Sequence, residues 1–282
     1  MTDAAGDAVD PGRGSVVTQA WAGVRAALAG FSWCFRSRSI AVWTGAAVLI
    51  YVTLWSVAMY VAASWDDRLV HAVMWPRGTA WWESAAYEIA KSALYFVFWL
   101  AAVVMTFVVA LPIVSPVFAF VAEATENEYF QDPIAHRSSV SELLKELLHS
   151  VVRSAALVAL HLSGAIAIWV FGLLAGLLFP PAATLIGVAL GGGWSAAWIA
   201  MAAASYAFEN NRTPARRQLA LLNAKPGLLL GFGAVAQFMA WIPFFAPLTV
   251  VSATVLLCRL HDFGHVELPL RRGHQYNSAP PA

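Results

Sequence analysis

The chain has 282 residues, of which 60% are hydrophobic and 12% are charged, and its formal net charge is +1. Soluble domains carry about 25% charged residues, so this composition excludes an ordinary soluble domain and predicts a protein embedded in a bilayer. Nucleic-acid binding is not expected either, because it requires a basic domain with clustered Lys and Arg.

The N-terminal third predicts a tail, an interfacial helix and a first membrane span. Residues 1–20 are rich in Gly, Ala and Asp and are expected to form a disordered tail rather than a signal peptide. Residues 20–35 place apolar side chains at helical spacing, which predicts an amphipathic helix at the membrane interface. Residues 40–63 contain no charge and predict the first span, which Arg36 and Arg38 precede.

A second span is expected at residues 87–111. Before it, residues 64–86 mix charged and tryptophan side chains, a composition that suits the headgroup level and predicts an interfacial loop or a short helix. After it, Pro112 and Pro116 each lack the amide hydrogen that a helix uses. We therefore expect the helix to break or bend there and to emerge as a polar arm from Glu123.

The predicted cytoplasmic arm covers residues 123–150, the most charged region of the chain. Ser139 and Glu142 have the spacing of a capping box that opens an amphipathic helix. Two interpretations of this helix stay open. It is either a plain solvated surface or a surface that recruits a protein partner.

Residues 154–208 contain no Asp, Glu, Lys or Arg and predict two more hydrophobic helices, whether these cross the membrane fully or re-enter it. His161 falls at membrane depth, where titratable groups are costly and are often functional. The alternative is a neutral imidazole that packs against a neighbouring backbone carbonyl.

The stretch from 226 to 262 holds two apolar runs, 227–242 and 244–258, that meet at a corner with Pro243 and Pro247. At about 1.5 Å per residue these runs reach about 22 to 24 Å, whereas the hydrocarbon core of a bilayer is roughly 30 Å thick. We therefore expect a half-penetrating helical hairpin. An ordinary tilted hairpin is the alternative.

The distribution of Lys and Arg predicts the topology. Nearly all of them fall on one side of this layout, in the two terminal segments and in the loops at 123–153 and 209–225. The positive-inside rule then places both termini in the cytoplasm. Residues 21–262 are expected to form one all-α membrane domain, and residues 263–282 a disordered C-terminal tail.

No catalytic residue, metal site or cofactor is expected. The chain has no G-x-S-x-G, H-E-x-x-H or P-loop motif, which are common signatures of hydrolases, zinc enzymes and nucleotide-binding proteins. Its histidines are scattered, and Cys34 and Cys258 are expected to be thiols that pack as small apolar groups.

Cations precede two of the predicted helices on the same side of the membrane, at Arg36 and Arg38 and at Arg216, Arg217 and Lys225. Helix N-termini carry unpaired amide hydrogens and a partial positive charge, and nearby Arg or Lys side chains strengthen an anion site. The alternative is that these cations only fix the topology and contact lipid phosphates.

A second group of residues is expected to line a pathway or to pack helices together. Gly231 and Gly233 leave a bare helix face, which serves close helix packing by default and exposes backbone to a permeant ion as the alternative. The whole group comprises Glu123, Gly231, Gly233, Pro243 and Pro247.

Three patches of the sequence form a recognisable set: ALPIVSP at 110–116 with Glu123, the Ser205–Asn210 segment before a basic loop, and the glycines, prolines and Ala-Thr pair of 226–262. Together they resemble the CysZ sulfate permease and etoposide-induced protein 2.4 family. The likeness covers roughly residues 20–260. It implies a bacterial inner (plasma) membrane protein with few full spans and half-penetrating hairpins, which forms homo-oligomers and passes sulfate toward cysteine synthesis.

The leading hypothesis is therefore a membrane transport protein for passive or ion-coupled uptake of a small oxyanion such as sulfate. The alternative is a structural or regulatory inner-membrane protein that recruits a partner through residues 123–150. A membrane enzyme would need a catalytic constellation assembled from dispersed residues.

Overall fold

The computed structural model describes residues 10–74, 80–131, 140–213, 215–240, 242 and 245–268, and their regular secondary structure is helical. The elements in chain order are α1 (Val16–Cys34), α2 (Arg38–Val73), α3 (Trp81–Phe130), α4 (Val140–Leu178), α5 (Pro180–Ile186), the π-helical segment η1 (Gly187–Gly191), α6 (Gly192–Asn210), α7 (Ala215–Ala224), α8 (Pro226–Ala240) and α9 (Ala246–Asp262).

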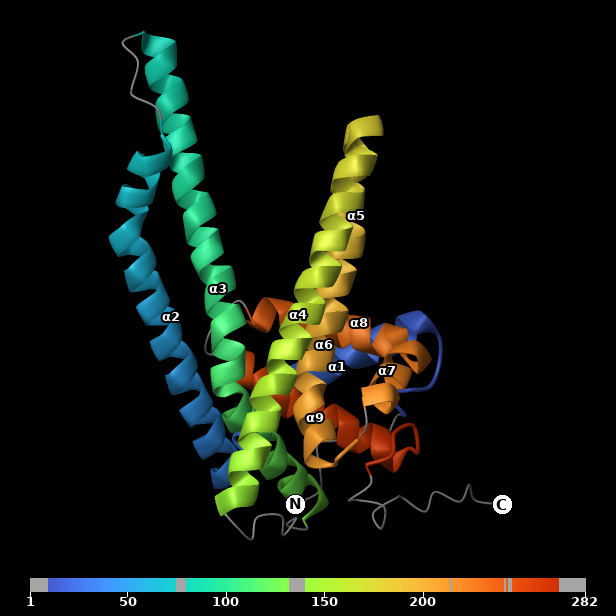
Figure 1. The fold of residues 1–282 in the computed structure, drawn as a ribbon. Helices are drawn as coiled ribbons and strands as arrows, with labels where there is room; N and C mark the ends of the chain where they lie inside the picture. Colours follow the sequence, from blue (N-terminus) through green and yellow to red (C-terminus); the bar gives the residue numbers. More distant parts are fainter. Residues whose placement is uncertain are drawn as a thin grey trace.

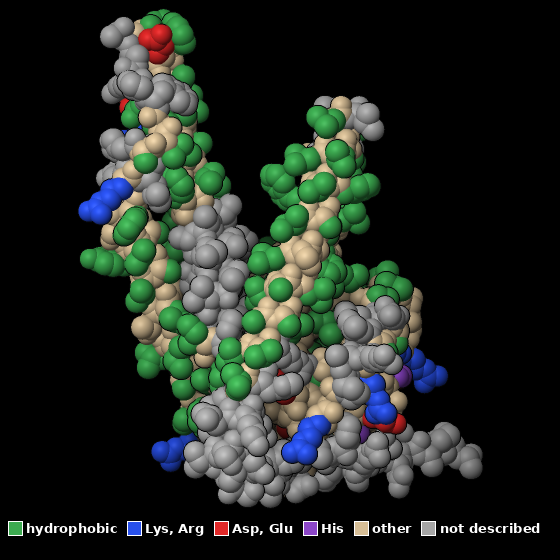
Figure 2. All heavy atoms as spheres, viewed as in Figure 1, with side chains coloured by type: hydrophobic (Ala, Val, Ile, Leu, Met, Phe, Trp, Pro, Cys, Tyr) green, Lys and Arg blue, Asp and Glu red, His purple; other side chains and the backbone are tan. Residues whose placement is uncertain are grey.

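Two long arms rise from a base of shorter helices (Figure 1). One arm pairs α2 with α3, and the other pairs α4 with the continuous run of α5, η1 and α6. Helices α1, α8 and α9 lie in the base, where α1 packs mainly on α8 and α9. Figure 2 shows hydrophobic side chains along both arms, whereas most of the visible Lys and Arg side chains lie at the base.

Three helical stretches are long and apolar enough to cross a membrane: Arg38–Trp65, Ala155–Leu177 and Thr184–Asn210. In the most apolar part of each stretch, at most 17% is buried inside the protein. The apolar side chains therefore face outward, an arrangement that is stable only in lipid. The first predicted span and the two hydrophobic helices of residues 154–208 are thereby confirmed. The protein is a multi-pass membrane protein.

Helix α3 continues through Pro112 and Pro116, so a break at these residues is wrong, whereas the expected bend stays a prediction. The reason lies in the turns around these prolines, where Val114 and Phe118 are buried in the core of the base. Their packing offsets the backbone hydrogen bonds that the prolines remove. The expected span at 87–111 forms part of this helix, and the side chains of residues 100–112 lie outside the described part of the chain.

The predicted polar arm does not leave the base at Glu123. The last turns of α3 contain Thr125 and Glu126, which are fully buried, so this part of the arm belongs to the core. The capping-box residue Ser139 lies outside the described residues. Helix α4 then begins at Val140 and runs without interruption into the next span.

The interfacial segment predicted at 64–86 is largely helical. Helix α2 extends to Val73 and α3 begins at Trp81, where the Glu83 carboxylate accepts a hydrogen bond from the backbone N–H of Ala80. Both helices therefore reach further than their apolar runs, because a tryptophan-rich sequence can remain helical at the headgroup level.

The stretch from 226 to 262 forms two short helices, α8 and α9, as the apolar runs predict. The surroundings of α9 differ from those expected for a hairpin in the membrane, because residues 246–258 are all buried within the base. Pro247 lies in the first turn of α9, where proline is favoured. Pro243 lies outside the described residues.

Helix α1 begins at Val16, where Ser15 Oγ accepts a hydrogen bond from the Thr18 amide, so the helix starts before the predicted residue 20. Its seam with α8 is a close backbone contact. A Cβ on Gly231 would collide with the carbonyl oxygen of Ala20, and a Cβ on Gly23 would collide with that of Leu228. Only glycine lets the two helices approach this closely.

Candidate functional site

The predicted cations fall at opposite ends of α1. Arg36 and Arg38 follow its C-terminus, whereas Lys225 Nζ donates a hydrogen bond to the carbonyl oxygen of Gly12, just before its N-terminus. A helix of 19 residues is about 28 Å long at about 1.5 Å per residue. The two groups therefore form two separate corners of the base.

Aromatic rings hold Arg36 in place at the first corner. Its guanidinium carbon lies 4.4 Å from the centroid of the Trp33 ring, and Trp33 stacks on Tyr129 with a centroid distance of 5.6 Å. Stacking restrains a guanidinium through its face, and the in-plane N–H groups of arginine have the geometry with which it grips oxyanions. Arg38 is exposed at the first position of α2.

Tyr129 ties this stack to the end of α9. Its hydroxyl donates a 2.5 Å hydrogen bond to the carboxylate of Asp262. Burial raises the pKa of Tyr129, and the hydrogen bond to Asp262 raises it further. The phenol therefore stays protonated and keeps donating to Asp262, which joins the ends of α1, α3 and α9 beneath the Arg36 guanidinium.

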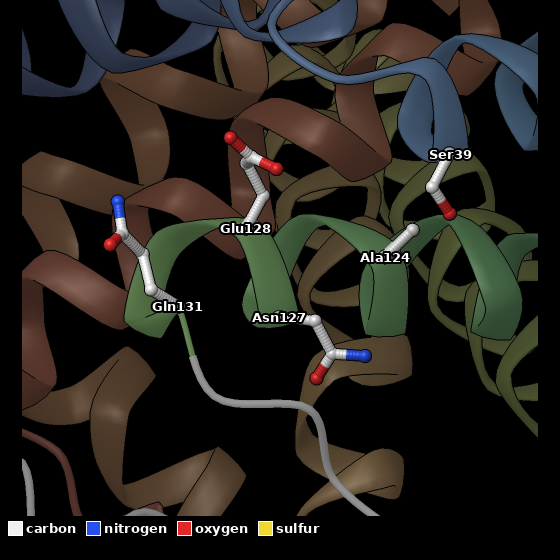
Figure 3. Close-up of a pocket in the computed structure, with 5 residues that line it drawn as sticks. All are labelled: Ser39, Ala124, Asn127, Glu128 and Gln131. Atoms are coloured by element: carbon white, nitrogen blue, oxygen red, sulfur yellow. The ribbon is translucent and has the colours of Figure 1, made fainter.

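An open pocket of about 350 Å³ lies between the start of α2 and the end of α3 (Figure 3). Its polar groups are a hydroxyl, two amides and a carboxylate. The first three can donate hydrogen bonds to an oxyanion, whereas the carboxylate repels one. Figure 3 shows Ser39 and Glu128 well apart along the lining, so an anion fits the Ser39 end better. The lining residues are Ser39, Ala124, Asn127, Glu128 and Gln131.

The other predicted cations have neighbours of their own. Arg217 lies exposed on α7 and donates a 2.7 Å hydrogen bond to the carboxylate of Glu267. The side chain of Arg216 lies outside the described residues. Lys225 is half-buried between the N-terminal segment and the start of α8.

The remaining predicted residues lie among packed helices. Gly231 faces the backbone of Ala20 in α1, and Gly233 faces the backbone of Ala196 in α6. Glu123 is half-buried on α3, and Pro247 is buried at the start of α9. Two helix backbones therefore cover the glycine face of α8.

Sequence reasoning missed a buried polar contact between α3 and the end of α6. The side-chain amide of Asn211 donates a 2.8 Å hydrogen bond to Glu126 Oε2, and both residues have no exposed surface. The sequence does contain a signal for the burial of Glu126. Phe118, Ala122 and Glu126 are spaced four residues apart, which places Glu126 on the same helix face as two apolar residues. Its charge pointed instead to a solvated arm.

The His161 side chain lies between α4 and α6, and both interpretations of its role remain predictions. The His161 ring stacks on Trp198 of α6 with centroids 4.2 Å apart, and the Trp194 indole N–H donates to the backbone carbonyl oxygen of His161.

Among the described residues, no cluster of three or more His, Cys, Asp or Glu side chains could hold a metal ion. Cys34 and Cys258 are buried and share no disulfide.

Residues 26–250 match the model of the sulfate transporter CysZ/etoposide-induced protein 2.4 family. The chain belongs to this family. The match confirms the resemblance seen in the sequence and includes the Arg36 corner and Lys225, but it ends before Asp262 and His265. No curated protein matches the chain.

Proposed function

We propose that the protein transports a small oxyanion such as sulfate across the bacterial inner membrane, by passive or ion-coupled uptake. The observation that carries the proposal is the Arg36 guanidinium stacked on Trp33, where the base meets the first membrane span. A cation restrained by an aromatic ring at a membrane boundary suits capture of a tetrahedral anion. Membership of a family named for a sulfate transporter supports the same substrate class.

The roles of the other predicted residues follow from their positions. Arg38 adds charge next to the Ser39 end of the pocket, and Arg217 and Lys225 supply a second positive region at the other corner. Glu123 helps to position the mouth of the pathway. The buried glycines of α8, Gly231 and Gly233, with Pro247 of α9, keep the base compact beside that pathway.

The proposed topology places both termini and the base at the cytoplasmic face, since Lys and Arg concentrate there under the positive-inside rule. With 15 residues, α8 reaches about 22 Å, too short to cross the roughly 30 Å hydrocarbon core. We infer that α8 and α9 enter the membrane from the cytoplasmic side and return to it. Homo-oligomers would then enclose the pathway between the arms of neighbouring copies.

Sulfate flux into proteoliposomes tests the proposal. R36A should lower the initial uptake of radiolabelled sulfate about tenfold, because a charge-assisted bidentate contact contributes on the order of 1.5 kcal/mol. R68A is the matched control, since Arg68 also stacks on a tryptophan, Trp65, near the far end of α2. No flux with the wild-type chain, or equal flux in R36A and the wild type, would contradict the proposal.

A further inference from the structure

The segment before α1 lies against residues that are distant in sequence. His265 Nε2 lies 2.7 Å and 2.9 Å from the two carboxylate oxygens of Asp10. The Gly12 amide donates a 2.8 Å hydrogen bond to Asp10 Oδ1, and Lys225 Nζ donates to the Gly12 carbonyl oxygen. Residues from both ends of the chain thus meet at the turn that precedes α8.

Lys225 and His265 border one small volume. A Cβ built on Gly12 would lie 2.7 Å from His265 Nε2 and 3.0 Å from Lys225 Nζ, so both nitrogens point at the same place. Helix α8 begins at the next residue, Pro226, and its N-terminus adds a partial positive charge. An ammonium group, an imidazole and the positive end of a helix therefore lie close to the segment.

The group at this position is itself an oxyanion. The Asp10 carboxylate faces His265 through both oxygens, and about a fifth of the Asp10 side chain and a quarter of the His265 side chain are exposed. Partial burial reduces the competition from water, so this hydrogen bond is stronger than the same one on an open surface. A tetrahedral oxyanion could take the place of the segment and accept from His265 Nε2, which faces Asp10, and from Lys225 Nζ, which donates to the Gly12 carbonyl oxygen in the structure.

We propose that Lys225 and His265 form an oxyanion-binding site, and that Asp10 occupies it as an anion built into the chain. A free oxyanion binds only when the N-terminal segment leaves, so Asp10 lowers the apparent affinity of the site. That its ligand is the transported anion rests on the proposed function. The site itself rests on the geometry of Asp10, Lys225 and His265, of which Asp10 and His265 lie outside the family match.

Gly12 provides a way to displace the segment without changing a charge. A Cβ at this position would lie 2.6 Å from the nearest ring carbon of His265, so either the segment or the His265 side chain must move. G12A should therefore separate the segment from His265 and leave Asp10, Lys225 and His265 chemically intact. D10N removes the competing charge and keeps the shape of the side chain.

Calorimetric titration of the purified full-length chain with sodium sulfate, at constant ionic strength in chloride, tests the proposal. D10N and G12A should each bind sulfate at least about threefold more tightly than the wild type, because the unoccupied fraction of the site increases. E267Q is the matched control, since it removes one acidic charge from the same C-terminal segment, where Glu267 pairs with Arg217. It should change the affinity little.

The double variant D10N/K225M locates the effect and should lose the gained affinity. Equal affinity in D10N, G12A and E267Q would overturn the proposal, as would a gain in D10N that persists in D10N/K225M. Repeating the titration in nanodiscs with and without phosphatidylglycerol identifies the source of the oxyanion. Loss of the gain only with phosphatidylglycerol would assign the site to a lipid phosphate, and its persistence would assign it to the free anion.

Transport and binding can fail separately. A gain in D10N without any sulfate flux in proteoliposomes would remove the transport function and keep the site. Flux that depends on Arg36, without a gain in D10N, would remove the site and keep the transport function.

Discussion

At the scale of single residues, the base is held by polar contacts that span the sequence. Asn211 donates to the buried carboxylate of Glu126, and Tyr129 donates to Asp262 on α9. A buried polar group without a partner costs about 1 to 3 kcal/mol, so each of these pairs fixes the alignment of two helices. Alignment at this corner determines where the Arg36 guanidinium lies.

Tyr129 should make stability depend on alkaline pH. Because its pKa is raised in the folded protein, the unfolded chain ionises first as the pH rises above about 10, the ordinary value for tyrosine. Its contribution is thus fully present below that pH and is lost above it, by at most about 1.4 kcal/mol per pH unit. Unfolding measured in detergent between pH 9 and pH 11 should show a shallower decline in Y129F.

D262N supplies the control, because Asp262 accepts the hydrogen bond of the Tyr129 hydroxyl and raises its pKa. D262N should also make the alkaline decline shallower. An identical pH profile for Y129F and the wild type would show that Tyr129 ionises equally in both states.

At the scale of elements, the seam between α1 and α8 determines the shape of the base. Both helices contribute glycines, so their backbones touch where side chains would normally keep them apart. The outer face of α1 remains apolar and exposed, as the amphipathic pattern of residues 20–35 predicts. Its large exposed side chains are Val16, Val17, Trp21, Leu28 and Phe35, the last just beyond the helix.

Gly231→Ala should destabilise the fold. The added methyl group collides with the Ala20 carbonyl oxygen, and overpacking of this kind costs about 1 to 3 kcal/mol. Gly45→Ala is the matched control, because a Cβ on Gly45 of α2 meets nothing within 4 Å. We expect a lower midpoint in thermal unfolding for the first variant and an unchanged or higher one for the second. Equal midpoints would show that the seam can open at little cost.

Apolar runs predicted which helices exist but not what surrounds them. The uncharged residues 40–63 indeed form a lipid-facing span, whereas 246–258 are as apolar and lie inside the protein. Hydropathy measures how favourable it is to remove a side chain from water, and burial in lipid or burial inside the protein removes it equally well. The same limit hid Glu126, whose charge suggested solvent although Asn211 binds it in the core.

At the scale of the whole molecule, the candidate sites could be predicted only in part. The sequence shows cationic residues before two of the helices, and in the structure the Arg36 guanidinium lies over the Trp33 ring. Their grouping into two corners was not visible, because it depends on how α1 lies in the base. The contact of Asp10 with His265 joins residues 255 positions apart, a pairing that no local pattern encodes.

The topology gives a prediction at this scale. If the base faces the cytoplasm, single cysteines introduced at Arg13 and Glu267, in a C34A/C258A background, should resist an impermeant maleimide in intact cells and react after lysis. Trp81→Cys, at the far end of the α2–α3 arm, should react in intact cells. The reverse pattern would place the termini outside.

Helix α3 has one further consequence. Its 50 residues extend over about 75 Å, from the far end of one arm into the core of the base. The helix joins the arm to Glu126 and Tyr129 without a break in the chain of helical residues. A tilt of the arm that passes Pro112 and Pro116 unabsorbed would shift the Tyr129 ring on which Trp33 stacks, and with it the Arg36 cation.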